Sequence, residues 1–402
     1  MKQLKVCIFT ETYFPVVGGG ETQAQLLAEG LIANGHSAII LTRRSDKTLK
    51  KVEQVGPVQV YRLPPVSKGQ LAKWGLVLSS IPALIKLHKQ YDILFVSGFR
   101  IVGVTAVLVS KLMRKKCILK ADSQGEMSGE FFNNGLKKLG LSPRFLPFRI
   151  FLNLRNYFLR KADAFSAISE DIAAELVSKN VAPHKIYLIP NAVDICRFFP
   201  ATPEQKSGLR RKLNLPESAR IVIYTGRLVS YKGLPILLEV WNELRLRHDN
   251  IRLLLLGSGG MDIHNCEAEL RAYVKAKSLD ESVSFTGNVP NVPEFLQASD
   301  IFAFPTENDA FPSSLIEAMA CALPVVTTPV GAIKTIIKSE QNGIIVQPSD
   351  QQGLCQALDK LICDTTLASC LGRAARDTAQ ANYSAEAVLE KYLSLFRKPA
   401  AA

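Results

Sequence analysis

Short runs of β-branched and aliphatic residues alternate with segments of helical periodicity along the whole chain. This alternation is typical of βαβ units built around a parallel sheet. It predicts strands at 6–10, 38–42, 58–63, 93–97, 117–121, 164–168 and 186–189, and then at 221–225, 251–256, 283–286, 301–304 and 325–327. It also predicts helices at 21–34, 234–246, 268–277 and 313–321. We therefore expect an α/β protein with two Rossmann-like doubly wound lobes.

A polar stretch rich in Pro, Lys and Arg, residues 200–217, separates the two series of strands. The 402 residues are enough for two or three domains. We place an N-terminal lobe at 1–198 and a C-terminal lobe at 199–383, followed by a helix at 384–398 that can pack back on the first lobe. Two such lobes leave a cleft between the carboxyl edges of their sheets, where ligands of these folds bind.

The segment GRLVSYKG, Gly226 to Gly233, follows directly on a predicted strand. Arg227 and Lys232 lie five residues apart in this strand-to-helix loop, so both side chains can converge on one anionic group at the positive end of the next helix. The pattern resembles a clamp for a diphosphate. Read alone, it fits two solvated surface cations equally well.

The segment DAFPSSLIEAMA, Asp309 to Ala320, also follows a predicted strand. Pro312 suits the first position of a helix. Glu317 lies one turn inside, where a carboxylate can accept both hydroxyls of a ribose, although a surface glutamate favoured by the helix N-terminus is the simpler interpretation. The free N–H groups expected to face an anion or a hydroxyl belong to Ser313, Ser314 and Leu315.

The C-terminal half resembles the nucleotide-sugar-binding lobe of retaining glycosyltransferases of the GT-B fold, family 4. The resemblance rests on the ordered segments GRL-x3-KG, LLLLGSGG, VSFTGNVPNV, ASDIFAFPT, D-x7-E, EAMACALPVV and NGIIV. In the N-terminal half, PVVGGGETQAQLLAEGLIANGHSAIILT is similar to the first βα unit of that family, and IPNAVD to its interlobe segment. The resemblance covers essentially the whole chain.

The resemblance implies a role for each matched residue. Arg227 and Lys232 would neutralise the diphosphate leaving group, and Glu317 would hold the ribose. The base would rest near Asn288 and Val289, flanked by the turn at 257–260. The other donor-binding positions would act through the backbone or through close approach, and they are Gly19, Gly20, Gly226, Ala310, Phe311, Pro312, Ser313, Ser314 and Leu315.

Two positions depart from the family pattern. Asp309 stands where the family has a Glu that touches the donor sugar, and its side chain is one methylene shorter. Many relatives have a His after the strand at 117–121, where this chain has Asp122 and Ser123. We count Asp309 and Asp122 among the catalytic candidates with Arg227 and Lys232, while a loop-capping role for Asp122 is an equal alternative.

Retention of anomeric configuration is implied by the resemblance alone. Front-face attack by the acceptor hydroxyl would need no protein nucleophile, and the sequence has no paired-carboxylate or Ser/His/Asp arrangement to supply one. There is no D-x-D pattern for a metal, and two cations can provide the charge that a metal would bring. We expect no cofactor and no metal, with a nucleotide-diphosphate sugar as the donor substrate.

The net charge of +13 comes entirely from the first half of the chain. Residues 1–198 hold 28 basic and 14 acidic residues, whereas 199–402 hold 21 and 22. The stretches 54–91 and 131–162 contain no acid, and the second, which includes Arg144 and Arg149, mixes seven cations with seven aromatic residues. This mixture favours an anionic membrane surface over nucleic acid, for which there is no recognisable module. A core helix with a solvated basic face is the plainer alternative.

The eight cysteines are scattered without a C-x-x-C pair, and no His stands at metal-ligand spacing. The N-terminus lacks a signal-peptide pattern, and the longest apolar stretches, near 74–87 and 101–113, are too short for a membrane span. We therefore expect a cytoplasmic protein, peripheral at the cytosolic face of a membrane.

Together these features predict a hexosyltransferase-type enzyme that moves a sugar onto a glycan or lipid-linked acceptor, in cell-surface polysaccharide or glycolipid biosynthesis. Two alternatives stay open. A GT-B sugar-nucleotide epimerase would need acid/base carboxylates and a His with no evident match here. A catalytically silent sugar-nucleotide-binding protein is suggested by Asp309 and by the missing His.

Overall fold

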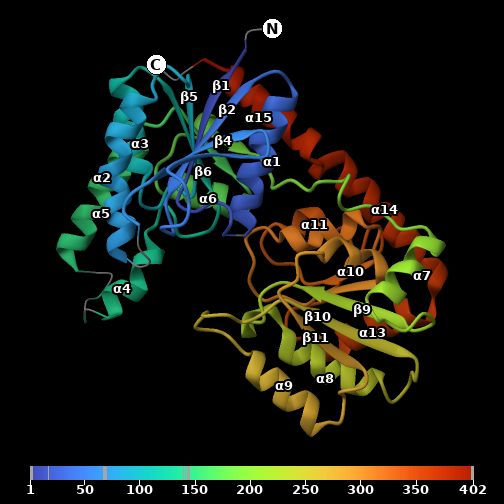
Figure 1. The fold of residues 1–402 in the computed structure, drawn as a ribbon. Coiled ribbons are helices and arrows are strands. Elements are labelled where there is room, and N and C mark those ends of the chain that lie inside the picture. Colours follow the sequence, from blue (N-terminus) through green and yellow to red (C-terminus); the bar gives the residue numbers. More distant parts are fainter. Residues whose placement is uncertain are drawn as a thin grey trace. The chain divides into compact units, whose positions relative to one another are not determined.

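The chain forms two compact units in the computed structural model, which describes residues 3–16, 18–66, 70–138, 140, 142 and 145–399 (Figure 1). Unit 1 comprises Met1–Asn191 and Val388–Ala402, and unit 2 comprises Ala192–Ala387. The boundary between the units falls inside the IPNAVD segment.

Unit 1 is built on an eight-stranded sheet in the order β3-β4-β2-β1-β5-β6-β7-β8. Its strands are β1 (Lys5–Thr10), β2 (Ser37–Arg43), β3 (Val52–Val55), β4 (Val58–Leu63), β5 (Ile93–Ser97), β6 (Lys116–Ala121), β7 (Ala164–Ala167) and β8 (Ile186–Leu188). Neighbouring strands are parallel except β3 and β4. The seven predicted strands are present. The edge strand β3 escaped prediction because none of its four residues is buried, which leaves it no hydrophobic run.

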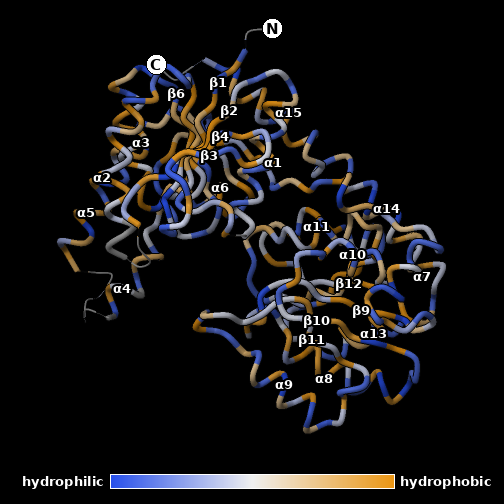
Figure 2. The backbone as a smooth tube through the Cα atoms, viewed as in Figure 1, coloured by the Kyte–Doolittle hydropathy of each residue, from blue (hydrophilic) through white to orange (hydrophobic). Residues whose placement is uncertain are grey.

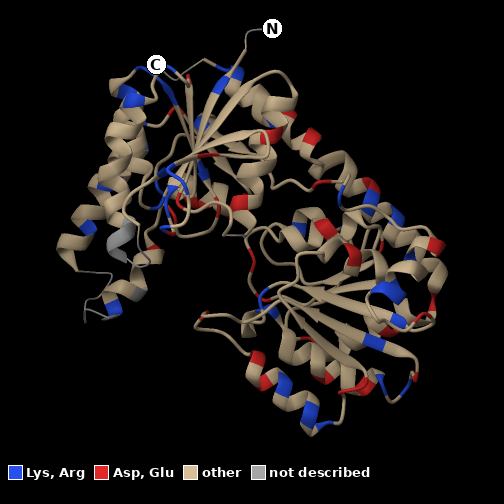
Figure 3. Ribbon diagram, in the orientation of Figure 1, with Lys and Arg blue, Asp and Glu red and all other residues tan. Residues whose placement is uncertain are grey.

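The helices of unit 1 lie on both faces of this sheet. They are α1 (Gly19–Ala33), α2 (Gln70–Lys86), α3 (Gly103–Leu112), α4 (Asn133–Lys138), α5 (Leu146–Leu159), α6 (Glu170–Ser178) and most of α15 (Ala385–Arg397), with short 3₁₀ turns at Glu130–Phe132 and Pro183–Lys185. Figure 1 shows α2, α3 and α5 side by side on one face and α1 and α15 on the other. Helices α2, α3 and α5 contain no acidic residue, and Figure 3 shows them without red segments.

Aromatic packing attaches the C-terminal helix to the sheet of unit 1. The ring of Phe95 on β5 lies 5.3 Å from that of Tyr392 and 5.8 Å from that of Phe396. The Lys116 ammonium donates to the carbonyl of Leu395 at 2.6 Å. Figure 2 shows the hydrophobic strands that form this core.

Helix α1 begins two residues before the start at residue 21 that the sequence predicted, within the glycine-rich segment 17–20. Val17 lies outside the described residues, Gly18 is the N-cap of α1, and Gly19 and Gly20 are its first helical residues. A helix can begin on these glycines because Gly18 has extended backbone and Glu21 puts a negative charge in the first turn.

Unit 2 has a six-stranded parallel sheet in the order β11-β10-β9-β12-β13-β14. Its strands are β9 (Arg220–Thr225), β10 (Ile251–Leu256), β11 (Val283–Gly287), β12 (Ile301–Phe304), β13 (Val325–Thr327) and β14 (Ile344–Ile345). Its helices are α7 (Pro203–Lys212), α8 (Leu234–Leu244), α9 (Glu267–Ala276), α10 (Val292–Ala298), α11 (Ser313–Ala320), α12 (Ile333–Ile336), α13 (Gln351–Cys363) and α14 (Thr365–Tyr383), with a 3₁₀ turn at Ser230–Lys232. The five predicted strands are present, and the two-residue β14 was not predicted.

The polar stretch 200–217, which we read as a linker, contains helix α7. Its start is a capping box, in which Gln205 N–H donates to Thr202 Oγ1 at 3.3 Å and Thr202 N–H donates to Gln205 Oε1 at 2.9 Å. The apolar periodicity of α7 is weak because its buried contact is made by an arginine, Arg210.

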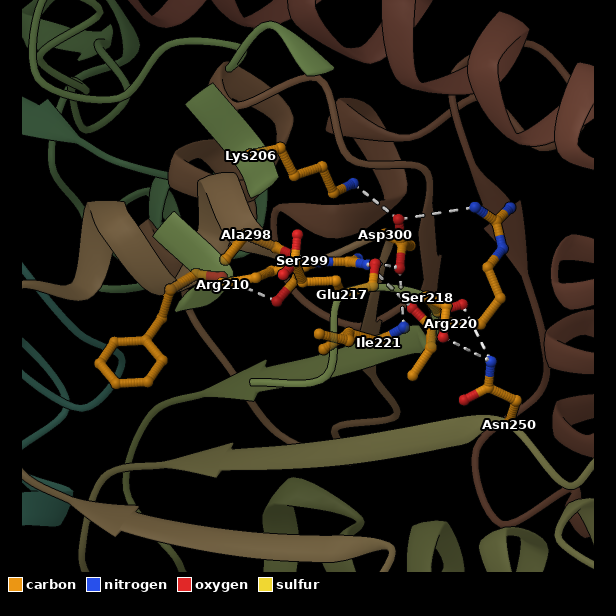
Figure 4. A network of polar contacts seen from close by, with 12 residues as sticks. Lys206, Arg210, Glu217, Ser218, Arg220, Ile221, Asn250, Ala298, Ser299 and Asp300 are labelled. Carbon is orange, nitrogen blue, oxygen red and sulfur yellow. Dashed lines mark hydrogen bonds and ion pairs between the residues drawn. The ribbon is translucent and has the colours of Figure 1, made fainter. Parts of the chain in front are cut away.

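A buried ionic cluster around Asp300 fastens α7 to the sheet of unit 2 (Figure 4). Lys206 Nζ lies 2.6 Å from Oδ1 of Asp300, and Arg210 Nη2 lies 2.7 Å from Oδ2. The backbone N–H of Ile221 donates to the same Oδ2 at 2.7 Å. The cluster thereby joins the starts of β9 and β12.

The order of strands reverses between β1 and β5 in unit 1 and between β9 and β12 in unit 2. In open α/β sheets, ligands bind beyond the carboxyl ends of the strands at such a reversal. Within the described residues, no helix is both long enough and apolar enough to cross a membrane.

Candidate active site

Lys232 and Asp309 meet at the strand reversal of unit 2. Lys232 ends the 3₁₀ turn that follows β9, and Asp309 lies in the loop after β12. The Lys232 ammonium donates to Asp309 Oδ2 at 2.6 Å and to the carbonyl of Asn308 at 3.0 Å. Lys232 is buried, and burial lowers its pKa from the ordinary value although Asp309 acts in the opposite direction. A lysine held this way is a poorly screened positive charge.

Arg227, the second predicted cation, is exposed and has a different carboxylate partner. Its guanidinium forms an ion pair with Asp262 and donates to the hydroxyl of Tyr231 at 2.7 Å. The Tyr231 ring is close to both cations, with its centroid 6.0 Å from the Arg227 guanidinium and 5.3 Å from the Lys232 ammonium. The predicted pair is therefore gathered around one ring, while each cation is held by its own carboxylate.

Three loops meet at the carboxyl ends of β9, β10 and β11. Gly226 N–H donates to the carbonyl of Leu256 at 2.9 Å, and Gly257 N–H donates to that of Gly287 at 2.9 Å. A Cβ on Gly257 would lie 1.9 Å from the carbonyl oxygen of Gly226, so the two backbones can approach only because residue 257 is glycine. Asn288 follows in the same region and donates through Nδ2 to Ser258 Oγ at 2.9 Å, while Val289 is half-buried.

Helix α11 follows the loop of Asp309 and begins at Ser313, the first residue of the predicted helix, although Pro312 does not take the first helical position expected for it. Pro312 is its N-cap with no side-chain cap, and Ser313 is the first helical residue. Among the described residues, the N–H groups of Ser313 and Ser314 have no hydrogen-bond partner, whereas Leu315 N–H donates to the Pro312 carbonyl at 3.2 Å. The predicted set of three free N–H groups is thus reduced to two.

The loop before α11 is held by backbone and ring contacts. Ala332 N–H donates to the carbonyl of Ala310 at 3.1 Å. The ring of Phe311 is buried and lies 5.9 Å from that of Tyr383. These contacts fix the chain between Asp309 and the start of the helix.

Glu317, one turn inside α11, has no hydrogen bond to its carboxylate among the residues that the structure describes. Burial raises its pKa to about 7, and the nearby Arg197 acts in the opposite direction. Its carboxylate can therefore accept hydroxyl groups from a ligand, and it does so best in the ionised form.

In unit 1, Asp122 follows β6 directly, next to the strand reversal. Ser97 at the end of β5 donates to Asp122 Oδ2 at 2.6 Å, and the Lys120 ammonium lies 2.6 Å from Oδ1. The side chain of Asp122 is 23% exposed, so its oxygens stay open to a ligand. Gly19 and Gly20 lie in the same unit at the N-terminus of α1.

Two neighbours of the predicted cations escaped the sequence analysis. Tyr231 is part of the GRLVSYKG segment, but a single tyrosine in a loop does not by itself indicate a contact with the neighbouring cations. Asp262 lies 35 residues from Arg227, and no spacing rule links the two.

A group of metal-ligand side chains lies elsewhere in unit 2. His248, Asp359 and Cys363 each bring one ligand atom within 4.8 Å of the others. The oxygens of Asp359 already face His248 Nε2 at 2.6 Å and Arg247 Nη1 at 3.9 Å. We assign no metal to this group.

Comparisons with known proteins agree with this architecture. The family model described as glycosyl transferases group 1 matches residues 205–378, and that described as glycosyltransferase family 4 matches residues 17–197. An uncharacterised glycosyltransferase of Methanocaldococcus jannaschii is 23% identical over 98% of each chain. N-acetyl-α-D-glucosaminyl L-malate synthase of Bacillus anthracis is 24% identical, over 96% of this chain and 95% of that protein.

Solved structures give the same result for the fold. Sucrose-phosphate synthase from Thermosynechococcus elongatus has a TM-score of 0.79 at 21% identity, with 98% of both chains covered. Anabaena HepE, solved with UDP and glucose, has a TM-score of 0.76 at 19% identity, with 99% of this chain and 100% of that chain covered.

Two doubly wound units with these matches define a glycosyltransferase of the GT-B fold. The chain belongs to glycosyltransferase family 4, as the two family models that match its halves show.

Proposed function

We propose that this glycosyltransferase moves a sugar from a nucleotide-diphosphate sugar to a hydroxyl group of a glycan or lipid-linked acceptor, with retention of configuration. The observation that supports the proposal most is the buried Lys232 at the strand reversal of unit 2, paired with Asp309 in the loop that leads to α11. Anabaena HepE, which has the same fold, has been solved with UDP and with UDP-glucose.

Lys232 and Arg227 would bind the donor diphosphate and stabilise the charge that it gains as the leaving group. A buried ammonium is suited to this because little water screens it. The diphosphate would draw Lys232 away from Asp309, whose carboxylate would then be free to accept hydroxyl groups of the donor sugar.

Glu317 would accept the ribose hydroxyls, and the loop at Asn288 and Val289 would border the base. The N–H groups of Ser313 and Ser314 would face a phosphate or sugar oxygen, because the N-terminus of a helix favours negative charge. Within unit 1, Gly19 and Gly20 at the N-terminus of α1 would offer their backbone N–H groups to an anion.

The anomeric configuration is retained if the acceptor hydroxyl attacks the sugar from the same face from which the phosphate departs. The acceptor oxygen forms its bond to the anomeric carbon as the bond from that carbon to the phosphate oxygen breaks, and the acceptor proton passes to the departing phosphate. No protein nucleophile takes part. The charge comes from Lys232 and Arg227, so the proposal includes neither a metal nor a cofactor.

The face of unit 1 formed by α2, α3 and α5 supports attachment to a membrane surface. All three helices expose large apolar side chains, and α3 packs against both of its neighbours. The exposed residues are Trp74, Leu78, Ile81 and Ile85 on α2, Leu108 and Leu112 on α3, and Leu146, Ile150, Phe151, Leu154 and Tyr157 on α5. Exposed cations, including Lys86 and Arg149, accompany them, as an anionic bilayer requires. Arg144, also counted in the sequence, lies outside the described residues.

This face fits a peripheral enzyme at the cytosolic side of a membrane, where lipid-linked acceptors for cell-surface polysaccharides or glycolipids are glycosylated. Nucleic acid is not part of the proposal.

The test is a thermal-shift screen with UDP-, GDP- and ADP-sugars on the wild type and on Lys232→Ala, followed by turnover assays with the donor that binds. A donor bound by the folded protein raises its melting temperature. We expect one base to stabilise the wild type more than Lys232→Ala, and transfer to follow. Binding without turnover would favour a silent binding protein, and conversion of the donor into its epimer without an acceptor would favour an epimerase.

A further inference from the structure

Behind Asp122 lies a second carboxylate, Glu126, which the proposed function leaves unused. Glu126 is 1% exposed and lies in the loop after β6. Its Oε1 accepts the N–H of Asp122 at 3.1 Å and the hydroxyl of Ser123 at 3.4 Å, and Arg100 Nε lies 3.6 Å from the same atom. One buried oxygen therefore holds three residues whose side chains are partly open to solvent.

These residues form a connected polar site at the ends of β5 and β6. Arg100 also donates to the Ser123 hydroxyl. Ser97 and Lys120 hold the two oxygens of Asp122, and the Lys120 ammonium lies 3.1 Å from Asn191 Oδ1. A hydroxyl group of an acceptor could donate to Asp122 and accept from Arg100 or Ser123 at the same time.

The loop that carries Glu126 is fixed from two helices. Glu175 of α6 accepts the N–H groups of Gly125, Met127 and Ser128 at 2.7, 3.1 and 2.9 Å. Arg155 of α5 donates to the carbonyl groups of Arg100 and Glu126, both at 2.9 Å. The charged groups around Glu126 are therefore Arg100, Lys120, Asp122, Arg155 and Glu175.

The second oxygen of Glu126 is buried without a hydrogen-bond partner among the described residues. A buried carboxylate in this state is costly, and protonation relieves part of the cost. Burial first and the charge of Asp122 second raise the pKa of Glu126 to about 7, although Arg100 and backbone hydrogen bonds oppose this. Near neutral pH, Glu126 can thus gain or lose a proton.

We propose that Glu126 is a positioning residue for sugar transfer, which in its ionised form holds Asp122, Ser123 and Arg100 as the binding site for the acceptor hydroxyl. The inference rests on the proposed function and adds a regulatory group to it. Protonation weakens all three contacts of Oε1, because each is strongest to a negative oxygen. Acceptor binding should then loosen as the pH falls through 7.

The experiment measures transfer from the donor found by thermal shift to octyl glucoside, octyl galactoside and octyl mannoside, between pH 5.5 and 8.5. In the wild type, the KM for the acceptor probe should rise about tenfold from pH 8 to pH 6. Glu126→Gln, which is neutral at every pH, should have the high KM throughout. At each pH, the Kd of the nucleotide and the rate of donor hydrolysis by water should differ by less than about twofold between Glu126→Gln and the wild type.

Glu130→Gln is the matched control, because Glu130 is an exposed carboxylate at the start of the 3₁₀ turn that follows this loop, and it should behave as the wild type. If Glu126→Gln does not fold, Ser123→Ala keeps the buried carboxylate and should still raise the KM for the acceptor. An unchanged KM and pH profile in both variants of an active enzyme would overturn the role of Glu126 alone. Absence of transfer and hydrolysis by the wild type with every donor would overturn the proposed function and this role together.

Discussion

Lys232 Nζ donates to Asp309 Oδ2 at 2.6 Å, so the cation proposed for the donor diphosphate is paired with the carboxylate proposed for the donor sugar. The two residues are 77 positions apart and come from loops after adjacent strands, β9 and β12. In the proposed donor site, the diphosphate would compete with Asp309 for the ammonium and would thereby release the carboxylate for the sugar.

This competition predicts that two substitutions both lower transfer, and that only one of them strengthens binding of the diphosphate. Lys232→Ala should lower the rate of transfer by about 100-fold or more, because a charge that stabilises the leaving group is lost. Asp309→Asn should bind the free nucleoside diphosphate about fivefold more tightly, because Lys232 is no longer neutralised, and should still lower transfer. Calorimetric titration and initial rates measure the two effects. Weaker diphosphate binding by Asp309→Asn would contradict the competition.

Glu317 predicts a pH dependence of donor binding. Its pKa is raised to about 7, and in the proposed site the ionised form would accept the ribose hydroxyls, so donor affinity would be full above pH 7 and would be lost as the pH falls. We expect binding of the nucleotide to weaken by about tenfold between pH 8 and pH 6. In Glu317→Gln this part of the pH dependence should vanish, whereas protonation of the diphosphate itself remains in both proteins. Parallel pH profiles of the two proteins would refute the assignment.

The cluster around Asp300 predicts a large loss of stability. Asp300→Asn leaves Lys206 and Arg210 without their carboxylate, which should lower the free energy of unfolding by about 3–5 kcal/mol. Burial disfavours the charge of Asp300, but Lys206 and Arg210 outweigh it and hold its pKa below the ordinary value. The contribution of the ionised Asp300 to the free energy of unfolding is therefore full above about pH 4 and is lost as the pH falls through the lowered pKa. Urea unfolding of the wild type and Asp300→Asn at pH 7 and below pH 4 tests both statements. If the substitution lowered the free energy of unfolding equally at the two pH values, the result would count against the ion pairs.

Gly331 predicts a packing effect on the loop of Asp309. A Cβ at this position would lie 1.8 Å from the carbonyl oxygen of Asp309, and the backbone φ of +50° also disfavours alanine. Gly331→Ala should cost about 2–4 kcal/mol of stability and weaken donor binding. Gly208→Ala in α7 is the control, because a Cβ there meets nothing within 4 Å. Similar melting temperatures of the two variants would show that the loop of Asp309 can shift to accept the Cβ without a loss of stability.

The apolar face of α2, α3 and α5 predicts binding to anionic vesicles. Leu78 and Leu112 are 72% and 74% exposed, and replacing either with Glu should lower partition into phosphatidylglycerol-containing vesicles by about tenfold. Leu246→Glu is the matched control, since this leucine is 84% exposed on unit 2. Co-sedimentation at low salt measures the effect. Equal binding to neutral vesicles, or equal loss with Leu246→Glu, would refute the anionic surface.

The strands and the fold class could be predicted because a strand covered by helices on both faces is a continuous run of apolar residues. Strand β9 is an example, with five of its six residues buried. Elements without such a run were missed. Strand β3 has no buried residue, and helix α7 joins the core through Arg210 and the capping pair Thr202 and Gln205.

The sequence by itself determined the two doubly wound units and named Arg227, Lys232, Asp309 and Glu317, because short segments carry strand, turn and charge together. The tertiary structure decided their partners. Asp309 for Lys232, Asp262 for Arg227 and Glu126 behind Asp122 depend on which loops meet at the carboxyl edge of a sheet. The order of strands across the sheet decides which loops lie together, and burial then sets the charge state of each side chain. Neither the partners nor the charge states can therefore be predicted from spacing along the chain.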